Sequence, residues 1–466
     1  MSSKAFNNAT KLNNLIDVTT LGLVADGTTD NTAALNVILE LTSSTRNQNQ
    51  GWANLYFPAG IYKIDGTVYV PGKAIFKLDG GCTIKLAGTS TSRFLNNTSA
   101  KPPQSAYTGY GDIWFLGGTF DCSGGLAAIT FAHSHGLRFR DATFTNAKNT
   151  HFIEINSSKD VIFDSCVFKN MVSDAPGLYE MLQFDYSHEA GFPSFGGWDN
   201  TPCTDCVVQN CSFDTGQSGV GSHANPAGDL HTAITITNNT ISNMAGDFSC
   251  GIRVQGWGYG CEVSNNYLKE CGEKPLQVLG NTDGVEILYN TVYGGGKTDS
   301  STGGYWFSLS DTVYPQKCTV TGNKAYNVFG KGFFFNGVND SRITGNEVYK
   351  SNKEGYYFNE SSRNTISTNI VNGCGGLAAN TYDAFYFLAN CSNNRIFSNT
   401  AKSDTGYSYR YALRIVNVNC STNRVNSNYF DLGGTSPIVN DSGTLTELNG
   451  ETFISAVMSN VTTGTI

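Results

Sequence analysis

The sequence predicts an all-β protein, a single-stranded right-handed parallel β-helix with a short N-terminal capping helix. Three observations predict it: a repeated strand and turn pattern, an asparagine that recurs at one place in the repeat, and a composition poor in charge. Only 15% of the 466 residues are charged, whereas ordinary domains carry about 25%. There are 52 glycines, and aromatic residues make up 12% of the chain. This composition favours strands and turns over surface helices.

The repeat consists of an apolar, polar, apolar strand, two turn residues ending in asparagine, and a further apolar position. It is clear in residues 160–168, 234–241 and 342–348. Alternating apolar and polar residues are typical of strands with one face inward. An asparagine at each corner suits a left-handed backbone and an amide that bonds to its neighbour in the next coil. The predicted ladder comprises Asn239, Asn266, Asn290, Asn323, Asn346, Asn369, Asn399 and Asn428, which are 23 to 33 residues apart.

A second strand precedes each of these corners, as in residues 251–255 and 355–359. Each coil is therefore expected to consist of strand, turn, strand and loop. An antiparallel sandwich would not repeat a ladder of identical side chains at a near-constant period along most of the chain. The sequence thus predicts the stacked coils of a β-solenoid.

Four segments are predicted along the chain: an N-terminal segment 1–14, an N-terminal cap 15–90, the parallel β-helix 91–430, and C-terminal cap or oligomerisation strands 431–466. Within the cap, residues 30–41 have the capping aspartate and the apolar face of a helix. A solenoid leaves an apolar core open at its end. We therefore expect this helix to lie across the first coil and cover it.

Charge and hydropathy exclude several classes of partner. The net charge is −8 and there is no cluster of lysine and arginine, so nucleic acid is not an expected partner. No run of 18 apolar residues occurs, and the first residues lack the apolar core of a secretory signal peptide. The sequence therefore predicts neither membrane insertion nor export by the general route.

The thirteen cysteines follow no disulfide rhythm and are expected to be reduced and mostly buried. Cys203 and Cys206 form a C-x-x-C pair, but no second pair stands at zinc-ligand spacing. The sequence predicts no metal and no cofactor.

Two motifs near the N-terminus resemble a known superfamily. Residues 17–34, Asp-Val-Thr-Thr-Leu-Gly-Leu-Val-Ala-Asp-Gly-Thr-Thr-Asp-Asn-Thr-Ala-Ala, and residues 56–62, Tyr-Phe-Pro-Ala-Gly-Ile-Tyr, resemble the opening of the pectate-lyase-like β-helix superfamily, which includes bacteriophage tailspikes and polysaccharide depolymerases. With the coils behind it, the resemblance covers roughly residues 14–430. Because members include lyases, hydrolases, epimerases and transferases, the resemblance leaves the chemistry open.

The resemblance implies a carbohydrate partner, such as a bacterial capsule, exopolysaccharide or lipopolysaccharide. For tailspike-like members it also implies a homotrimer in the virion tail, which acts outside the cell and needs no signal peptide. Aromatic residues on the later coils are expected to face outward, at an interface between subunits or beneath loops. They are Phe333, Phe335, Tyr356 and Tyr386.

One coil is enlarged. The step from Cys166 to Cys211 spans 45 residues, whereas the preceding coil measures 24. Insertions in solenoids form loops on one face, which is often the binding face. The added residues 186–202 are rich in glycine and aromatic residues and include His188 and Trp198. They are expected to form a wall of a glycan groove, the alternative being a surface loop whose rings pack on its own coil.

Alternation also identifies the outward positions beside this loop. In residues 151–156 and 180–185 every second residue is apolar and is assigned inward, which leaves the polar residues outside. A single outward polar residue is the ordinary solvated side of a sheet, but several lie together here. The outward residues predicted in successive coils are Glu154, Gln183, Asp185, His223, Arg253 and Gln255, followed by Trp257.

Two of these residues have the spacing of a catalytic pair. Glu154 and Asp185 lie one coil apart and offset by two residues, so their backbones are expected to be roughly 8 Å apart. Glycosidases use two carboxyl groups about 5 to 9.5 Å apart. The sequence therefore predicts glycoside hydrolysis with Asp185 central, Glu154 or Asp199 as its partner, and His223 in the catalytic set. The residues expected to bind the substrate are Gln183, His188, Trp198, Arg253, Gln255 and Trp257.

Two other functions remain open. A polysaccharide lyase would take the C5 proton of a uronic acid, with Arg253 or a cation steadying the sugar carboxylate. A receptor-binding spike would hold the glycan through tyrosine and tryptophan without cutting it. Asp383 and Glu360 lie in later coils without a companion loop and are assigned no role.

Overall fold

The fold is given by a computed structural model that describes residues 15–44, 52–87, 93–96, 105–123, 127–175, 177–189, 197–225, 227–296, 302–310, 313–431, 439–444, 446–449 and 452–453. The chain divides into two compact units. The first consists of Met1–Gly216 with Asn225–Asp229, and the second of Gln217–Ala224 with Leu230–Ile466. Each unit is a parallel β-helix, which confirms the predicted fold class.

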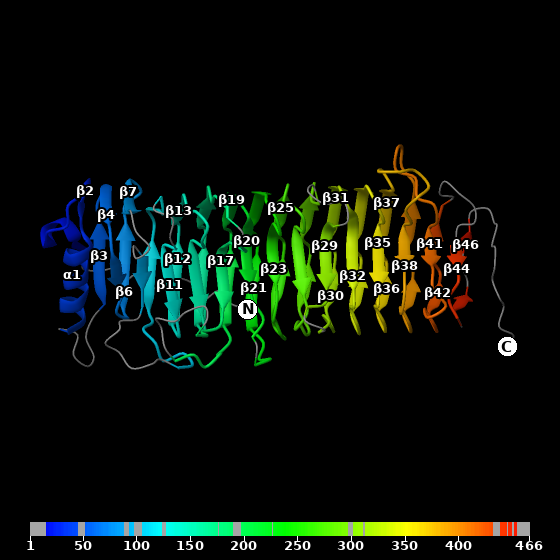
Figure 1. The fold of residues 1–466 in the computed structure, drawn as a ribbon, viewed down its shortest axis with the longest axis horizontal. Coiled ribbons are helices and arrows are strands. Elements are labelled where there is room, and N and C mark those ends of the chain that lie inside the picture. The colour runs from blue at the N-terminus through cyan, green and yellow to red at the C-terminus, as the bar shows by residue number, and fades with distance from the viewer. Residues whose placement is uncertain are drawn as a thin grey trace. The chain divides into compact units, whose positions relative to one another are not determined.

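Three parallel sheets surround the core of the first unit (Figure 1). Sheet A contains β1 (Ile16–Asp17), β3 (Ala53–Phe57), β6 (Ala74–Leu78), β9 (Ile113–Leu116), β12 (His135–Arg140), β15 (Lys159–Asp164) and β18 (Thr204–Gln209). Sheet B contains β2 (Asp26–Asp30), β4 (Gly60–Ile64), β7 (Cys82–Leu86), β10 (Thr119–Asp121), β13 (Thr143–Thr145), β16 (Val167–Lys169) and β19 (Ser212–Gly216). Sheet C contains β5 (Thr67–Tyr69), β8 (Arg93–Leu95), β11 (Ile129–Ala132), β14 (Ile153–Asn156) and β17 (Glu180–Asp185).

The second unit repeats the same three sheets. Sheet A contains β21 (Thr232–Thr237), β24 (Glu262–Ser264), β27 (Glu286–Leu288), β30 (Thr319–Thr321), β33 (Arg342–Thr344), β36 (Thr365–Ser367), β39 (Arg395–Phe397), β42 (Arg424–Asn426) and β45 (Glu447–Asn449). Sheet B contains β22 (Thr240–Met244), β25 (Tyr267–Lys269), β28 (Thr291–Tyr293), β31 (Lys324–Val328), β34 (Glu347–Ser351), β37 (Ile370–Cys374), β40 (Thr400–Lys402), β43 (Tyr429–Phe430) and β46 (Thr452–Phe453). Sheet C contains β20 (Ser218–Ser222), β23 (Cys250–Val254), β26 (Leu276–Leu279), β29 (Gly303–Ser308), β32 (Lys331–Asn336), β35 (Tyr356–Asn359), β38 (Phe385–Phe387), β41 (Leu413–Ile415) and β44 (Val439–Asp441).

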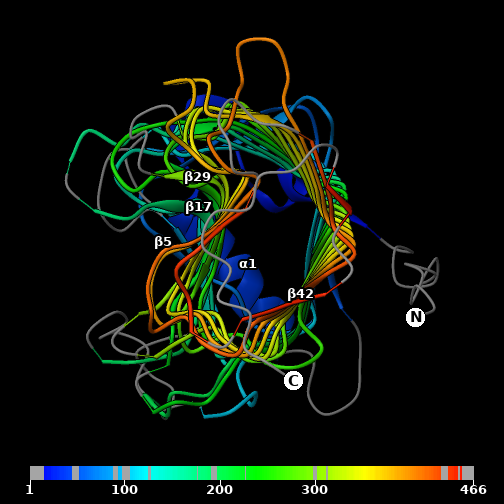
Figure 2. The same cartoon turned by 90° about the vertical axis from the view of Figure 1, so that its right-hand side faces the viewer.

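The N-terminal helix α1 (Thr32–Ser44) follows a short 3-10 helix, η2 (Val18–Leu21), and lies across the first coils (Figure 2). The Asp30 carboxylate accepts a hydrogen bond from the backbone N–H of Thr32 at the start of α1. The Asn36 side chain bonds to the backbone of β5 at both Thr67 and Tyr69. The predicted capping helix is therefore confirmed, two residues later at its start and three at its end than the predicted residues 30–41.

Like residues stack on like along the core of each unit. The rings of Phe139 and Phe163 lie 4.4 Å apart and nearly parallel in the first unit, and those of Tyr305 and Phe333 do the same in the second. Because the register is exact from one coil to the next, an apolar side chain meets its counterpart in the next coil. All thirteen cysteines are free and buried, as the sequence predicts.

The asparagine ladder runs through the second unit as predicted. The Oδ1 atom of Asn346, for example, accepts hydrogen bonds from the backbone N–H and the Nδ2 of Asn323, both at 3.0 Å. Its own Nδ2 donates to the carbonyl of Val320 at 2.8 Å. The side chain thus satisfies buried backbone groups that the corner leaves without a strand partner.

The backbone at the ladder differs from the prediction. The left-handed residue is the one before each ladder asparagine, as with Asn238 (φ 57°), Tyr289 (φ 56°) and Thr368 (φ 54°), and no ladder asparagine has a positive φ. The left-handed residue turns the chain, and the asparagine after it then points its amide into the corner. The prediction of two turn residues was therefore correct, but the first of them, and not the asparagine, adopts the left-handed conformation.

Three of the four later aromatic residues expected to face outward are in the core. Phe333, Phe335 and Tyr356 are fully buried, and only Tyr386 points outward and is half-buried. The strands β44, β45 and β46 pair in parallel with the coil before them, so the regular stacking continues beyond residue 431. No helix in the described part of the chain is long and apolar enough to cross a membrane.

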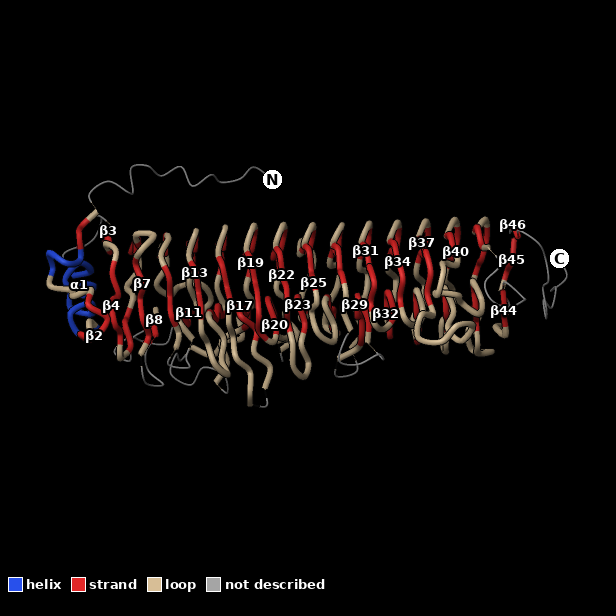
Figure 3. Tube along the Cα trace, turned by 90° about the horizontal axis from the view of Figure 1, so that it is seen from above, coloured by secondary structure: helices blue, strands red, loops and turns tan. Residues whose placement is uncertain are grey.

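The corners differ in length, and this positions the candidate site. In Figure 3 the turns beside β13 and β19 in the first unit, and beside β22 in the second, are short, whereas the long loops of each unit leave the coils beside sheet C. A long loop can close over the outward face of the sheet that it borders. Outward side chains of sheet C are therefore the ones that loops can cover or enclose.

Candidate carbohydrate-processing site

The predicted register of the carboxylate pair is confirmed. Strands β14 and β17 pair in parallel, with Glu154 opposite Gln183 and Asn156 opposite Asp185. Glu154 and Asp185 therefore lie on neighbouring coils, offset by two residues, with their side chains on the outward face of sheet C. The inward positions between them are apolar and fully buried.

This outward face is not open to solvent along its whole length. Asp185 is only 3% exposed and Asn156 is fully buried, whereas the Glu154 side chain is 17% exposed. The Asp185 carboxylate accepts hydrogen bonds from Gln183 Nε2 at 3.2 Å and from the backbone N–H of Tyr186 at 2.8 Å. Asp185 is thus held in a fixed orientation under cover, and Glu154 is the carboxylate nearer to solvent.

Three residues that the sequence analysis missed surround Glu154. Thr130 Oγ1 donates to Glu154 Oε2 at 3.0 Å. His151 Nε2 lies 3.9 Å from Glu154 Oε1, and His151 Nδ1 lies 3.6 Å from Glu180 Oε2. Glu180 is 1% exposed. An imidazole between two carboxylates, beside a hydroxyl, is a constellation suited to proton transfer.

A signal in the sequence could have found two of them. The pairing of Ile153 with Leu182 places His151 opposite Glu180 when it is continued two residues back. Alternation assigns both residues inward, because they have the parity of Ile153 and Leu182, but His151 precedes β14 and Glu180 is the first residue of β17. Alternation is a poor guide at the start of a strand, so a register argument was needed.

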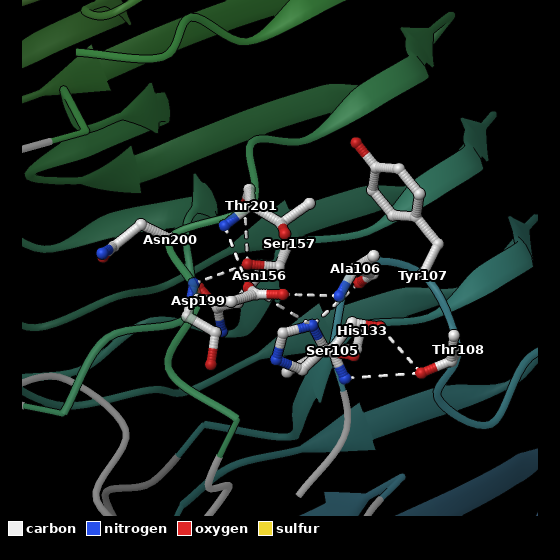
Figure 4. A network of polar contacts seen from close by, with 12 residues as sticks. Ser105, Ala106, Tyr107, Thr108, His133, Asn156, Ser157, Asp199, Asn200 and Thr201 are labelled. Atoms are coloured by element: carbon white, nitrogen blue, oxygen red, sulfur yellow. Dashed lines mark hydrogen bonds and ion pairs between the residues drawn. The ribbon is translucent and has the colours of Figure 1, made fainter. Parts of the chain in front are cut away.

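Asp199, the alternative partner of Asp185, is engaged elsewhere. Its Oδ2 accepts from the backbone N–H of Ala106 at 2.6 Å, and its Oδ1 accepts from that of Thr201 at 3.0 Å (Figure 4). His133 Nδ1 lies 4.0 Å from Oδ1 and donates to the Ala106 carbonyl at 2.8 Å. Asp199 therefore clamps the segment around residue 106 to residues 199–201, which is a positioning role.

The clamp predicts a pH dependence. Burial raises the pKa of Asp199, but the hydrogen bonds from Ala106 and Thr201 outweigh it, so the pKa lies below the ordinary 3.8. A carboxyl with a lowered pKa stabilises the fold above its unfolded pKa, and this stabilisation is lost as the pH falls through the folded value. The melting temperature of Asp199→Asn is therefore expected to be below that of the wild type at pH 6 and to approach it below pH 3. A constant difference from pH 6 to pH 2.5 would count against the clamp.

The enlarged loop is described only at its two ends. The His188 ring lies 4.9 Å from that of Tyr186, and Trp198 is 39% exposed. Residues 190–196, which include Phe192 and Phe195, lie outside the described residues. The substrate-binding role of Trp198 stays a prediction.

The second unit holds the other predicted residues. Gly221, Arg253 and Gln277 occupy one outward column of sheet C. Arg253 Nη2 donates to Gln255 Oε1 at 2.9 Å, and Gln255 Nε2 donates to Ser310 Oγ at 3.3 Å. The outward positions predicted for Arg253 and Gln255 are therefore confirmed.

His223 and Trp257 differ from each other in accessibility. His223 is half-buried, and its carbonyl oxygen bonds to the ring of His231 at 3.1 Å. Trp257 was predicted to follow the outward column, but it is fully buried, and its indole N–H has no hydrogen-bond partner. It follows the end of β23, where the chain turns and the alternation no longer applies. Trp257 is not available to stack on a substrate in this conformation.

Metal ligands are not grouped in the described ranges, where no three His, Cys, Asp or Glu side chains meet in a geometry that would hold a metal ion. The site therefore consists of carboxylates, a histidine and amides on the outward face of a parallel β-helix.

Sequence comparison agrees with this architecture. The family described as rhamnogalacturonase A/epimerase, pectate lyase-like matches residues 15–274. The chain belongs to this family.

Individual relatives are more distant. The plasmin and fibronectin-binding protein A of Streptococcus pneumoniae is 24% identical over 277 residues, which are 52% of this chain and 37% of that protein. The chain thus matches little more than a third of the length of this curated relative.

Two solved structures share the fold. The crystal structure of PfbA, a surface adhesin of Streptococcus pneumoniae, has a TM-score of 0.59 at 17% identity, covering 90% of this chain and 91% of that one. The A-module of the mannuronan C-5 epimerase AlgE4 of Azotobacter vinelandii has a TM-score of 0.51 at 12% identity, covering 95% and 100%. At these identities the likeness is one of fold.

Proposed function

We propose that this chain is a polysaccharide depolymerase, a glycoside hydrolase that cuts a bacterial surface glycan with Glu154 and Asp185. The observation that carries the proposal is the register of β14 and β17, which gathers both carboxylates on one outward face beside the enlarged loop. Membership of a family named for a rhamnogalacturonase and an epimerase supports a glycan as the substrate.

The two carboxyl groups have different roles in the proposed hydrolysis. Glu154 is the more exposed and donates a proton to the glycosidic oxygen as the bond to the anomeric carbon breaks. Asp185, fixed by Gln183 and the backbone of Tyr186, accepts the proton of the attacking water or adds to the anomeric carbon itself. Thr130 holds the Glu154 carboxyl in place. Trp198 supplies an aromatic surface for a sugar ring.

A second candidate is β-elimination by a lyase, and His151 favours it. Its Nδ1 bonds to the carbonyl of Glu180 at 2.7 Å. If Nδ1 carries the proton of this bond, Nε2 keeps a lone pair, and Nε2 points toward Glu154. In such a lyase His151 takes the C5 proton of a uronic acid, and the glycosidic oxygen leaves from C4 with a proton from Glu154.

A third candidate is binding without cleavage. The relatives include a bacterial surface adhesin, and nothing in an adhesin requires a catalytic pair. Because the N-terminal motifs resemble those of tailspikes, we also propose that the chain belongs to a tailspike in a virion tail and forms a homotrimer. The mass of the assembly in solution by light scattering tests the trimer directly.

One assay separates the three functions. The purified chain is incubated with a panel of capsular polysaccharides and lipopolysaccharides, and the products are followed by mass spectrometry and near-ultraviolet absorbance. Products that have gained the mass of water support hydrolysis, and unsaturated products that absorb in the near ultraviolet support the lyase. Retention of a glycan without any shortening supports the binder and overturns cleavage.

A further inference from the structure

A second group of charged side chains lies in the second unit, where the chain enters sheet C. Glu354 and Asp383 stand on neighbouring coils, since the backbone N–H of Gly355 donates to the carbonyl of Asp383 at 3.2 Å. Asp383 is fully buried, whereas Glu354 is partly exposed. The sequence analysis left Asp383 without a role because no enlarged loop accompanies it.

Arginine holds the buried carboxylate. Arg410 donates from Nε and Nη2 to the two oxygens of Asp383 at 3.1 and 2.8 Å. Arg414 Nη1 lies further away, 3.7 Å from Asp383 Oδ2, and the buried Nε of Arg414 has no hydrogen-bond partner. A bidentate pair is strong and specific. Asp383 is therefore committed to Arg410, and Arg414 retains hydrogen-bonding capacity for another anion.

Glu354 also has an unsatisfied atom. Its Oε2 is buried without a hydrogen-bond partner. Burial raises the pKa of the Glu354 carboxyl, and the charge of Asp383 adds to the rise while Lys331 and Lys353 oppose it. Unsatisfied buried polar groups lower stability, and in native proteins they are found at functional sites.

The local charge is opposite in sign to that of the whole chain. Four cations stand against two carboxyl groups here, although the net charge of the chain is −8. A local excess of positive charge attracts an anionic ligand. The four cations are Lys331, Lys353, Arg410 and Arg414.

A row of stacked rings leads to Arg414. Trp306, Phe334, Tyr357 and Tyr386 occupy one outward column of sheet C, and Arg414 follows in the same column. Their ring centroids lie 3.8 to 5.3 Å apart. Because each ring covers the face of the next, the row offers mostly edges to a sugar. The Arg414 guanidinium lies 5.7 Å from the centroid of the Tyr386 ring, within the range of a cation–π contact.

We propose that Glu354 and Arg414 form a second glycan-binding site, which takes the carboxylate of an acidic sugar such as a uronic acid. The proposal rests on the polysaccharide substrate class proposed above, but it is independent of the cleavage step at Glu154 and Asp185. Arg414 pairs with the sugar carboxylate, and the Glu354 carboxyl forms a hydrogen bond with a hydroxyl group of the same sugar. No covalent step is involved.

The test uses the full chain and immobilised acidic capsular polysaccharides, each paired with the same polymer after chemical reduction of its carboxyl groups to alcohols. The wild type is expected to bind at least one acidic polymer at least 10-fold more tightly than its reduced form. Arg414→Met is expected to lose this preference at least 10-fold, and Glu354→Met, which cannot form a hydrogen bond, is expected to bind the acidic polymer at least 10-fold more weakly than the wild type. Arg342→Met, at an exposed position of sheet A, is the matched control and is expected to bind as the wild type does.

Stability measured at pH 7 separates binding from a purely structural role. Glu354→Met keeps the size of the side chain and removes a carboxyl oxygen that is buried without a partner, so its melting temperature is expected to equal or exceed that of the wild type while affinity falls. The proposal is overturned if no acidic polymer is bound, if carboxyl reduction has no effect, or if both variants bind as tightly as the wild type. Loss of cleavage in Asp185→Asn with binding retained concerns the proposed function alone.

Discussion

Replacing Asp185 with asparagine is expected to slow polysaccharide cleavage by about 10²- to 10⁴-fold, the range typical for removal of a general acid or base. The substitution keeps the shape of the side chain and removes its ability to accept a proton. The backbone N–H of Tyr186 can still donate to the amide oxygen of asparagine. The fold and glycan binding are therefore expected to persist. Reducing-end release at saturating polymer is the measurement.

Two further variants test the partner of Asp185 and provide a control. Glu154→Gln is expected to slow cleavage to a similar extent, because the leaving oxygen then departs without a proton. Glu189→Gln, on the exposed start of the enlarged loop, is the control and is expected to cleave normally. An active Asp185→Asn protein would remove Asp185 from the mechanism, and an inactive Asp185→Asn with an active Glu154→Gln would leave Asp185 with a different partner.

Much of the fold could be predicted because each position of the repeat is occupied by residue types with one structural role, either in a strand or at a corner. Alternation identified strands and their inward faces, and the recurring asparagine identified one corner. The assignment of the left-handed conformation to the asparagine itself was wrong by one residue. Serine, threonine and tyrosine precede several ladder asparagines, and none of these residues signals a positive φ.

The candidate site was predictable only where strand alternation applies. Glu154, Asp185 and Arg253 stand where alternation and register place them. His151 and Glu180 were missed because alternation assigns both to inward positions, and Trp257 was misplaced because it follows the end of β23. The burial of Asp185 was not predictable, since alternation separates inward from outward positions and does not tell what covers the outward face. Asp383 was set aside because no enlarged loop accompanies it, and the arginines that hold it come from a later coil.

The asparagine ladder should account for a large share of the stability of the second unit. Replacing Asn346 with alanine is expected to lower the free energy of unfolding by about 2 to 5 kcal/mol. The change leaves the backbone N–H of Asn323 and the carbonyl of Val320 buried without the partners that the Asn346 side chain provides. The space that the Asn346 side chain vacates is too small for water to reach both groups unless the corner opens. The shift of the urea unfolding midpoint is the measurement.

Asn372→Ala is the matched control for the ladder, because Asn372 is half-exposed and its Nδ2 makes one long hydrogen bond, 3.3 Å, to Glu347 Oε1. It is expected to change the free energy of unfolding by less than about 1 kcal/mol. Equal effects of the two substitutions would mean that the ladder contributes no more than a surface amide. A large effect at Asn346 alone means that each corner depends on the amide of the next coil. Coil stacking in the second unit is then cooperative through these side chains as well as through the sheets.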